Sequence, residues 1–273
     1  MEVTLRFSLI LATYGRYKEV ETLLQSLLLQ SFHDYELIIV DQNPKGFLQN
    51  IIDKYSNEIK IVYIHESSKG LSSARNTGLK RASGEIIGFP DDDCVYEQDT
   101  LEQVNKLFIN DVAAITGEYV YMGMTQEHNI DKKCIKLNKY NVWKHGISFT
   151  IFIRSNVCRE IGCFNEELGV GSGTQYGSGE ETDYLLRIIE QNLYIINSKK
   201  PRIYHPAPIY DDFRKAYRYS LGRMYVIDKH NYNILFVFVN ILYPLVKMII
   251  YFYSFKKLRY CWYQFLGRIR YYM

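Results

Sequence analysis

Short apolar runs alternate with amphipathic segments along the first third of this chain, and this alternation limits the fold more than any other feature. The apolar runs occupy residues 7–12, 36–40, 59–64 and 85–89, and helical periodicity marks residues 19–30 and 71–82. A continuous apolar run is typical of a strand that is buried on both faces. We therefore expect an α/β, Rossmann-like fold, in which a mostly parallel sheet is covered by helices on both faces.

The middle of the chain predicts further strands and one glycine-rich loop. The expected strands are at 113–121, 147–153 and 193–196. A loop over 169–179 contains five glycines and leads into an expected helix over 180–191, which has acids at its N-terminus. These segments extend the sheet domain to about residue 210.

The C-terminal part of the chain differs from the rest in charge. From Phe213 to Met273 there are six arginines and five lysines against one acid, Asp228, which gives this stretch a net charge of +10. The whole chain carries +3, so the remainder carries −7. We therefore predict two domains, a sheet domain over 1–210 and a basic, aromatic helical tail over 211–273.

An apolar run over 234–255 makes the tail a candidate for contact with a membrane. About 20 apolar residues cross a bilayer, but Asn240, Pro244 and Lys247 interrupt this run. Apolar side chains flanked by lysine and arginine also suit a helix that lies on an anionic membrane surface. Spanning, lying on the surface, packing on the core and forming a homo-oligomer or partner interface all remain open. Nucleic acid is not an expected partner, because the residues between the charges are too aliphatic.

The cysteines and the N-terminal segment indicate in which cellular compartment the chain is expected. The chain has five cysteines, an odd number without a C-x-x-C pair, so neither a disulfide framework nor a zinc site is indicated. A reducing compartment fits this pattern. The first apolar run is too short for a signal peptide. We expect a cytoplasmic protein, peripheral on the cytoplasmic face of the membrane.

Three polar segments follow the expected strands of the first third. They are residues 13–16, Asp41 and residues 91–93. Ligands of parallel α/β sheets bind beyond the carboxyl ends of the strands. The three segments are distant in sequence but are expected to meet at one edge of the sheet, which makes that edge the candidate site.

The adjacent acids Asp91, Asp92 and Asp93 are the main candidates for binding a metal. Adjacent carboxylates repel one another unless a positive group lies beside them, and Mg²⁺ and Mn²⁺ prefer carboxylate oxygens. In an extended segment Asp91 and Asp93 would face the same side, with Asp92 facing elsewhere. The alternative is an acidic turn that is simply solvated.

Other polar residues have a functional and a structural interpretation. Asp41 could accept a hydrogen bond from a nucleobase or cap the following turn. Glu181 and Asp183 could include a general base for an acceptor hydroxyl or complement a helix dipole. His205 could be a metal ligand, although a lone histidine is more often structural.

At these positions the chain resembles the family 2 glycosyltransferases, which have the GT-A fold. The resemblance covers most of residues 5–210. The matching segments are the opening strand and turn (8–16), the E-(apolar)-V-D strand (36–41), G-x-x-x-A-R-N-x-G (70–78), the strand leading to the acidic cluster (84–93), a G-x-F-D-E-like segment (162–166) and a G-E-D-x-D-like segment (179–183). Gly15 replaces the usual Asn, whereas Gln42, Asn165 and Glu181 each stand where the family has Asp.

The resemblance implies a role for each matched residue. The nucleotide-sugar pocket would include Thr13, Arg16, Asp41, Arg75 and Asp92. Asp91 and Asp93 would hold Mn²⁺ or Mg²⁺ against the diphosphate, with His205 as a further candidate ligand. Glu181 matches the family's catalytic Asp, and Asp183 competes for that role.

The implied reaction is the transfer of a sugar, with inversion of its anomeric centre. The donor would be a nucleotide sugar, with UDP-sugars as the default, and the acceptor a hydroxyl of a glycan or lipid-linked molecule in surface polysaccharide synthesis. A non-catalytic GT-A-like subunit of a polysaccharide assembly complex is the alternative. A nucleotidyltransferase is less favoured, because residues 13–16 are not the glycine-rich basic loop usual in that class.

Overall fold

The structure of the chain is a computed structural model that describes residues 5–109, 111–124 and 133–273. The chain divides into two compact units. The first unit comprises Met1–Lys69, Ser73–Phe164 and Tyr184–Ala207, and the second comprises Gly70–Ser72, Asn165–Asp183 and Pro208–Met273.

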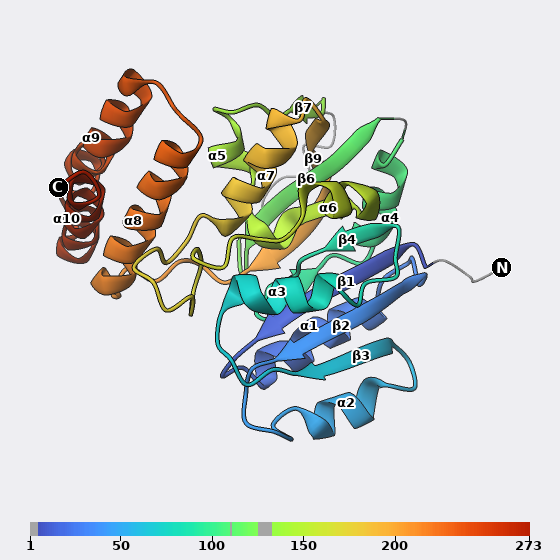
Figure 1. Cartoon of the computed structure of the whole chain (residues 1–273). Coiled ribbons are helices and arrows are strands. Elements are labelled where there is room, and N and C mark those ends of the chain that lie inside the picture. The colour runs from blue at the N-terminus through green and yellow to red at the C-terminus, as the bar shows by residue number, and fades with distance from the viewer. Residues whose placement is uncertain (1–4, 110, 125–132) are drawn as a thin grey trace. The chain divides into compact units, whose positions relative to one another are not determined.

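The strands of the first unit form one sheet (Figure 1). Their bounds are β1 Phe7–Thr13, β2 Tyr35–Asp41, β3 Lys60–His65, β4 Ile86–Gly88, β5 Val95–Tyr96, β6 Val112–Tyr121, β7 Ile135–Lys136, β8 Ile151–Arg154 and β9 Tyr194–His205. The spatial order is β3-β2-β1-β4-β8-β6-β9-β5, and β7 pairs with β9. β1 is parallel to both β2 and β4, and β2 is parallel to β3. The N-terminal part of the sheet is therefore parallel, as the sequence predicts.

Helices connect these strands. Their bounds are α1 Lys18–Leu28, α2 Gln49–Tyr55, α3 Leu71–Leu79, α4 Thr100–Leu107, α5 Val142–His145, the 3-10 helix η1 Ser148–Thr150, α6 Ser155–Ile161 and α7 Glu180–Glu190. The sequence predicts α1, α3 and α7. It does not indicate α2, α4, α5 or α6, which have at most eight residues each.

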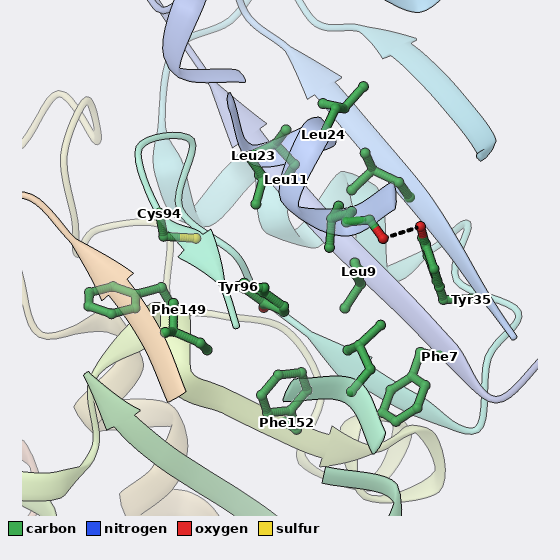
Figure 2. Close-up of a cluster of buried hydrophobic side chains, with 14 of the residues drawn as sticks. Phe7, Leu9, Leu11, Leu23, Leu24, Tyr35, Cys94, Tyr96, Phe149 and Phe152 are labelled. Carbon is green, nitrogen blue, oxygen red and sulfur yellow. Dashed lines mark hydrogen bonds between the residues drawn. The ribbon is translucent and has the colours of Figure 1, made fainter. Parts of the chain in front are cut away.

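The side chains of β1 alternate between the two faces of the sheet. On the face toward α1 they join one buried cluster, drawn in Figure 2, that includes Phe7, Leu9, Leu11, Leu23 and Leu24. The hydroxyl of Tyr35 donates to the main-chain oxygen of Leu27 within this cluster, at 3.0 Å. On the opposite face Ile10 packs so closely on Gly78 of α3 that an added methyl group would collide with it. The two helices thus cover opposite faces of the strand.

The other part of the sheet is mixed. β8 is antiparallel to both β4 and β6, and β9 is parallel to β6 but antiparallel to β5 and β7. The order of these strands could not be predicted from the apolar runs, because the strands that pair are far apart in the chain. The predicted class, a large α/β sheet with helices on both faces, is confirmed.

The bounds of two expected strands differ from those in the structure. The expected strand over 147–153 begins as the 3-10 helix η1, and its strand starts only at Ile151. The expected short strand over 193–196 is the first part of β9, which has 12 residues. The apolar run over 234–255 contains one helix that ends at Ile250, and the next helix begins only at Phe255.

The second unit contains three consecutive helices, α8 (Phe213–Lys229), α9 (Ile234–Ile250) and α10 (Phe255–Arg270). Asp212 and Asn233 cap the first two, each accepting a hydrogen bond from the main-chain nitrogen three residues later, at 2.8 and 2.9 Å. α10 packs tightly on α8, since a Cβ at Gly267 would lie 3.0 Å from that of Ser220. The predicted helical tail is confirmed.

One side of α9 exposes large apolar side chains. They include Ile234, Leu235, Phe238, Val239, Leu242, Val246, Ile249 and Ile250. Asn240 and Pro244, by contrast, are buried. Of the helices that the structure describes, none is long and apolar enough to cross a membrane.

Candidate functional site

The carboxyl ends of β1, β2 and β4 lie at one edge of the sheet. Thr13 is the register partner of Asp41, and the main-chain nitrogen of Gln42 donates to the oxygen of Thr13 at 3.0 Å. β4, the other neighbour of β1, ends at Gly88, just before the acidic cluster. The parallel topology therefore places the cluster next to the turn after β1, as expected.

Asp91 and Asp92 bind different partners. A carboxylate oxygen of Asp91 lies 3.1 Å from Nη2 of Arg75, which is only 1% exposed, and the other accepts from Ser148 at 3.2 Å. Asp92 accepts a hydrogen bond from the hydroxyl of Thr13 at 2.9 Å. The sequence does not indicate Ser148, because it is 57 residues from Asp91 and lies in the unpredicted 3-10 helix.

Asp93 lies between an arginine and a histidine. Its two oxygens are 3.3 Å from Nη2 of Arg16 and 3.1 Å from Nε2 of His205. The other ring nitrogen of His205 donates to the main-chain oxygen of Pro206 at 2.8 Å. The ring also stacks on that of Phe149, with 4.6 Å between the ring centres. His205 is thus held in a fixed orientation with Nε2 toward the acidic cluster.

The backbone of the cluster is not extended. Residues 92–93 form a turn, and the nitrogen of Cys94 donates to the oxygen of Asp91 at 3.3 Å. The expectation that Asp91 and Asp93 share one side of an extended segment is therefore wrong. In the turn each carboxylate has its own set of cationic or hydroxyl partners.

Burial and crowding shift the pKa values of these acids. Burial raises the pKa of Asp92 to about 6 and also raises that of Asp91, against the opposing charge of Arg75. Burial acts in the same direction on Asp93, but the hydrogen bond and charge of His205 outweigh it and lower the pKa of Asp93. For His205, burial acts to lower the pKa, whereas Asp93 raises it above its ordinary value. The cluster is thus a place where added positive charge would be stabilising.

Asp41 has no exposed surface. One oxygen accepts from the main-chain nitrogen of Asn43 at 2.9 Å and from its side chain at 2.7 Å, and the other accepts from the Tyr63 hydroxyl at 2.8 Å. Asn43 in turn accepts from the nitrogen of Gly15 at 2.6 Å. Asp41 therefore organises the loops after β1 and β2 in this structure, which matches the capping interpretation.

Glu181 and Asp183 belong to the second unit, at the start of α7. Asp183 is completely buried, and one of its oxygens lies 2.6 Å from Nζ of Lys229 and 2.9 Å from Nε2 of His230. Glu181 is half-buried. The two acids, which sequence alone could not separate, therefore differ in access to solvent.

The acidic cluster offers ligand atoms that suit a divalent cation. An oxygen of Asp93 and Nε2 of His205 are adjacent, and Asp91 influences the charge of both. Within residues 5–109, 111–124 and 133–273, no three His, Cys, Asp or Glu side chains are already gathered as a metal site. Mg²⁺ is commonly held by only one or two carboxylates together with substrate phosphates. The residues thus fit a cation that binds together with a diphosphate.

The family model described as glycosyl transferase family 2 matches residues 8–161. This match spans more than half of the chain and includes the turn after β1 and the whole acidic cluster. The chain belongs to glycosyl transferase family 2, and the resemblance found in the sequence is confirmed.

Several curated relatives match parts of the chain. Poly(ribitol-phosphate) β-N-acetylglucosaminyltransferase TarS of Staphylococcus aureus is 32% identical over 119 residues, which are 42% of this chain and 19% of TarS. Glycosyltransferase AglE of Haloferax volcanii is 27% identical over 195 residues, 67% of this chain and 64% of AglE. The glucosyltransferase WfgD of Escherichia coli, which acts on α-D-GlcNAc-diphosphoundecaprenol, is 28% identical over 113 residues, 41% of this chain and 45% of WfgD. The chain thus spans less than two thirds of the length of each.

Solved structures share the fold. S. aureus TarS 1–349 in complex with UDP-GlcNAc has a TM-score of 0.62 at 20% identity, covering 80% of this chain and 66% of that one. The mannosyltransferase PcManGT of Pyrobaculum calidifontis, in complex with GDP-Man and Mn²⁺, has a TM-score of 0.64 at 15% identity, covering 98% and 76%. The predicted GT-A fold is confirmed.

Proposed function

We propose that this chain is an inverting, metal-dependent glycosyltransferase that moves a sugar from a nucleoside diphosphate sugar to an acceptor hydroxyl. The observation that carries the proposal is the acidic cluster at the carboxyl edge of the sheet, with Arg16 and Arg75 beside it. Carboxylates and guanidinium groups in one place suit a diphosphate that arrives with a cation.

In this proposal the donor occupies the edge formed by the turn after β1 and the acidic cluster. Arg16 contacts the diphosphate, and Arg75 lies near the donor, where its pairing with Asp91 supplies positive charge. Thr13, which is held by Asp92, lines the pocket. Asp41 supports the base-binding loops through Asn43 rather than by direct contact, in line with its burial. UDP is the proposed nucleotide, and the complexes of TarS with UDP-GlcNAc and UDP are consistent with that choice.

The proposed metal ligands are Asp91 and Asp93, with His205 as a further ligand. Mn²⁺ or Mg²⁺ bound there would offset negative charge on the departing nucleoside diphosphate. The chain's own contribution is to hold His205 in place through Phe149 and Pro206. The Mn²⁺ in the complex of PcManGT with GDP-Man is in keeping with this role.

The proposed general base is Glu181. It would take the proton of the acceptor hydroxyl while the acceptor oxygen bonds to the anomeric carbon and the bond from that carbon to the diphosphate breaks. Asp183 is the weaker candidate, because a completely buried carboxylate that is paired with Lys229 and His230 has no free access to an acceptor. Attack opposite the leaving group would invert the anomeric centre.

The proposed acceptor is a glycan or a lipid-linked molecule in surface polysaccharide synthesis. The named substrate of WfgD is of the lipid-linked kind. The exposed apolar side of α9 and the basic residues of the tail support a peripheral position on the cytoplasmic face of a membrane.

The test is nucleotide release from a panel of nucleotide sugars, with Mn²⁺ or Mg²⁺ and with a chelator, for wild type and Asp93→Ala. We expect slow hydrolysis of one donor that stops with chelator and in the variant. If no donor turns over and no nucleotide binds in a metal-dependent manner, the catalytic proposal fails and a non-catalytic subunit takes its place.

A further inference from the structure

Three cationic side chains lie together among the helices of the tail. Arg223 of α8 donates through Nε to the side-chain oxygen of Asn240 at 2.9 Å, and Arg268 of α10 donates to the main-chain oxygen of the same residue. Lys247 is one helical turn beyond Pro244 on the side of α9 that carries Asn240. The two arginines thus meet at Asn240, and Lys247, whose charge they both influence, lies on the same side of the helix.

Arg268 is held in an unusual state. It is only 5% exposed, and its Nε is buried without a hydrogen-bond partner. Burying a charged donor without a partner is costly. Burial and the charge of Arg223 lower the pKa of Arg268 to about 9, and burial and Arg268 lower that of Lys247.

The three acids of the tail have other partners, and Asp212 caps α8. Asp228 accepts from the hydroxyl of Tyr271 at 2.9 Å, and Asp211 pairs with Lys256 at 3.0 Å. The neighbours that act on the charge of Arg268 are Arg223, Tyr243 and Cys261, none of which is a carboxylate. A guanidinium keeps its proton in proteins, so this cluster is suited to an anion that comes from outside the chain.

We propose that Arg223, Lys247 and Arg268 form a binding site for the phosphate group of a membrane lipid. The free N–H of Arg268 and the neighbouring cationic groups would donate to phosphate oxygens. Tyr243 lies at the solvent-exposed side of the site, since it is 49% exposed and the centre of its ring lies 4.9 Å from Nζ of Lys247. The exposed side chains of Leu242 and Val246 adjoin it and would meet the acyl chains.

This inference rests on the proposed membrane contact and names the chemical group that the tail would recognise. It differs from general attraction between basic residues and anionic lipid, which depends on charge density and not on the headgroup. The distinguishing feature is therefore a preference for phosphate over another anion of equal charge.

The test is vesicle binding by the full chain, comparing phosphatidylglycerol with oleate in phosphatidylcholine vesicles of equal negative charge. We expect wild type to prefer phosphatidylglycerol by about fivefold or more, the size of one well-placed charge contact. Lys247→Gln should lose this preference. Lys256→Gln is the matched control, because it removes the same charge at an exposed position and should keep the preference.

A second measurement uses inorganic phosphate and thermal unfolding at constant ionic strength. Phosphate should raise the unfolding temperature of wild type and Lys256→Gln more than that of Lys247→Gln. Equal binding to both vesicle types by wild type, or a preference that survives in Lys247→Gln, would overturn the site. If phosphate stabilises the protein but the protein binds no vesicles, the ligand is free phosphate and the lipid proposal is overturned. Donor turnover tests the catalytic proposal separately.

Discussion

At the scale of single residues, neighbouring acids in the sequence have separate environments. Asp91, Asp92 and Asp93 are consecutive, yet they bind an arginine, a threonine and an arginine–histidine pair respectively. Glu181 and Asp183 are two residues apart, and only Asp183 is completely buried. Residue type alone therefore does not decide which carboxylate does chemistry, whereas burial and partners separate the candidates.

Substitution of these two acids should have different effects. Glu181→Gln should lower kcat by about 100-fold or more, because a general base commonly contributes that much, and should leave the unfolding midpoint in urea unchanged. Asp183→Asn should reduce the free energy of unfolding by about 2–4 kcal/mol, because it breaks a buried ion pair. If Asp183→Asn were stable but inactive, and Glu181→Gln active, the assignment of the base would be reversed.

The sequence predicts most residues of the site but not their contacts. Thr13, Arg16, Arg75 and the acidic cluster can be found because each follows a strand or lies in a family motif. The turn over 92–93 and the contribution of Ser148 cannot be found in this way, since both depend on pairing between segments that are distant in the chain. Asp41 lies at the predicted edge of the sheet. That its carboxylate is bound by Asn43 and Tyr63 could not be predicted from the sequence.

At the scale of elements, the close contact between α3 and β1 holds the helix that carries Arg75, the partner of Asp91. Gly78→Ala would raise helix propensity by about 1 kcal/mol, but its methyl group would collide with Ile10. Overpacking typically costs about 1–3 kcal/mol, so we expect the variant to be less stable in urea denaturation. Lys80→Ala, at an exposed position just after the helix, is the control and should be near neutral.

The buried Glu36 ties β2 to the segment before β4 in a manner that depends on pH. Burial acts to raise its pKa, but hydrogen bonds from Ser8 and Ser83 outweigh this and hold the pKa below its ordinary value. The ionised group therefore contributes stability above the unfolded-state pKa, and the contribution is lost as pH falls through the lower folded-state pKa.

Glu36→Gln should accordingly lower the free energy of unfolding by about 1–3 kcal/mol at pH 7. The difference from wild type should shrink below about pH 4. Glu58→Gln, at an exposed position, should show no such difference. A gap between wild type and Glu36→Gln that stays constant down to pH 3 would contradict the assigned role.

At the scale of the whole molecule, the chain combines a family 2 glycosyltransferase fold with a basic helical unit. The parallel strands, the acidic edge and the helical tail could be predicted, because apolar periodicity and charge report on them directly. The mixed end of the sheet and the inclusion of residues 165–183 in the second unit could not, because they arise from long-range packing.

The proposed membrane contact predicts that vesicle binding depends on the exposed side of α9. Val246→Glu should weaken binding to anionic vesicles by about tenfold or more, because it replaces an apolar contact with a charge of the same sign as the lipid. Ile109→Glu, at an exposed apolar position in the first unit, should have no effect on vesicle binding. Sedimentation with vesicles measures the binding of both variants. Equal binding by the two would exclude α9 as the part of the chain that contacts the membrane.

The central claim is that the acidic cluster binds a nucleoside diphosphate together with a metal ion, and calorimetric titration of UDP into the full chain tests it most directly. We expect Mn²⁺ to tighten UDP binding by about tenfold or more over chelator in wild type, as a shared cation–diphosphate site requires. Asp93→Asn should remove this gain while the protein stays folded. UDP binding that is the same with Mn²⁺ and with chelator, or a metal effect that persists in Asp93→Asn, would contradict the claim.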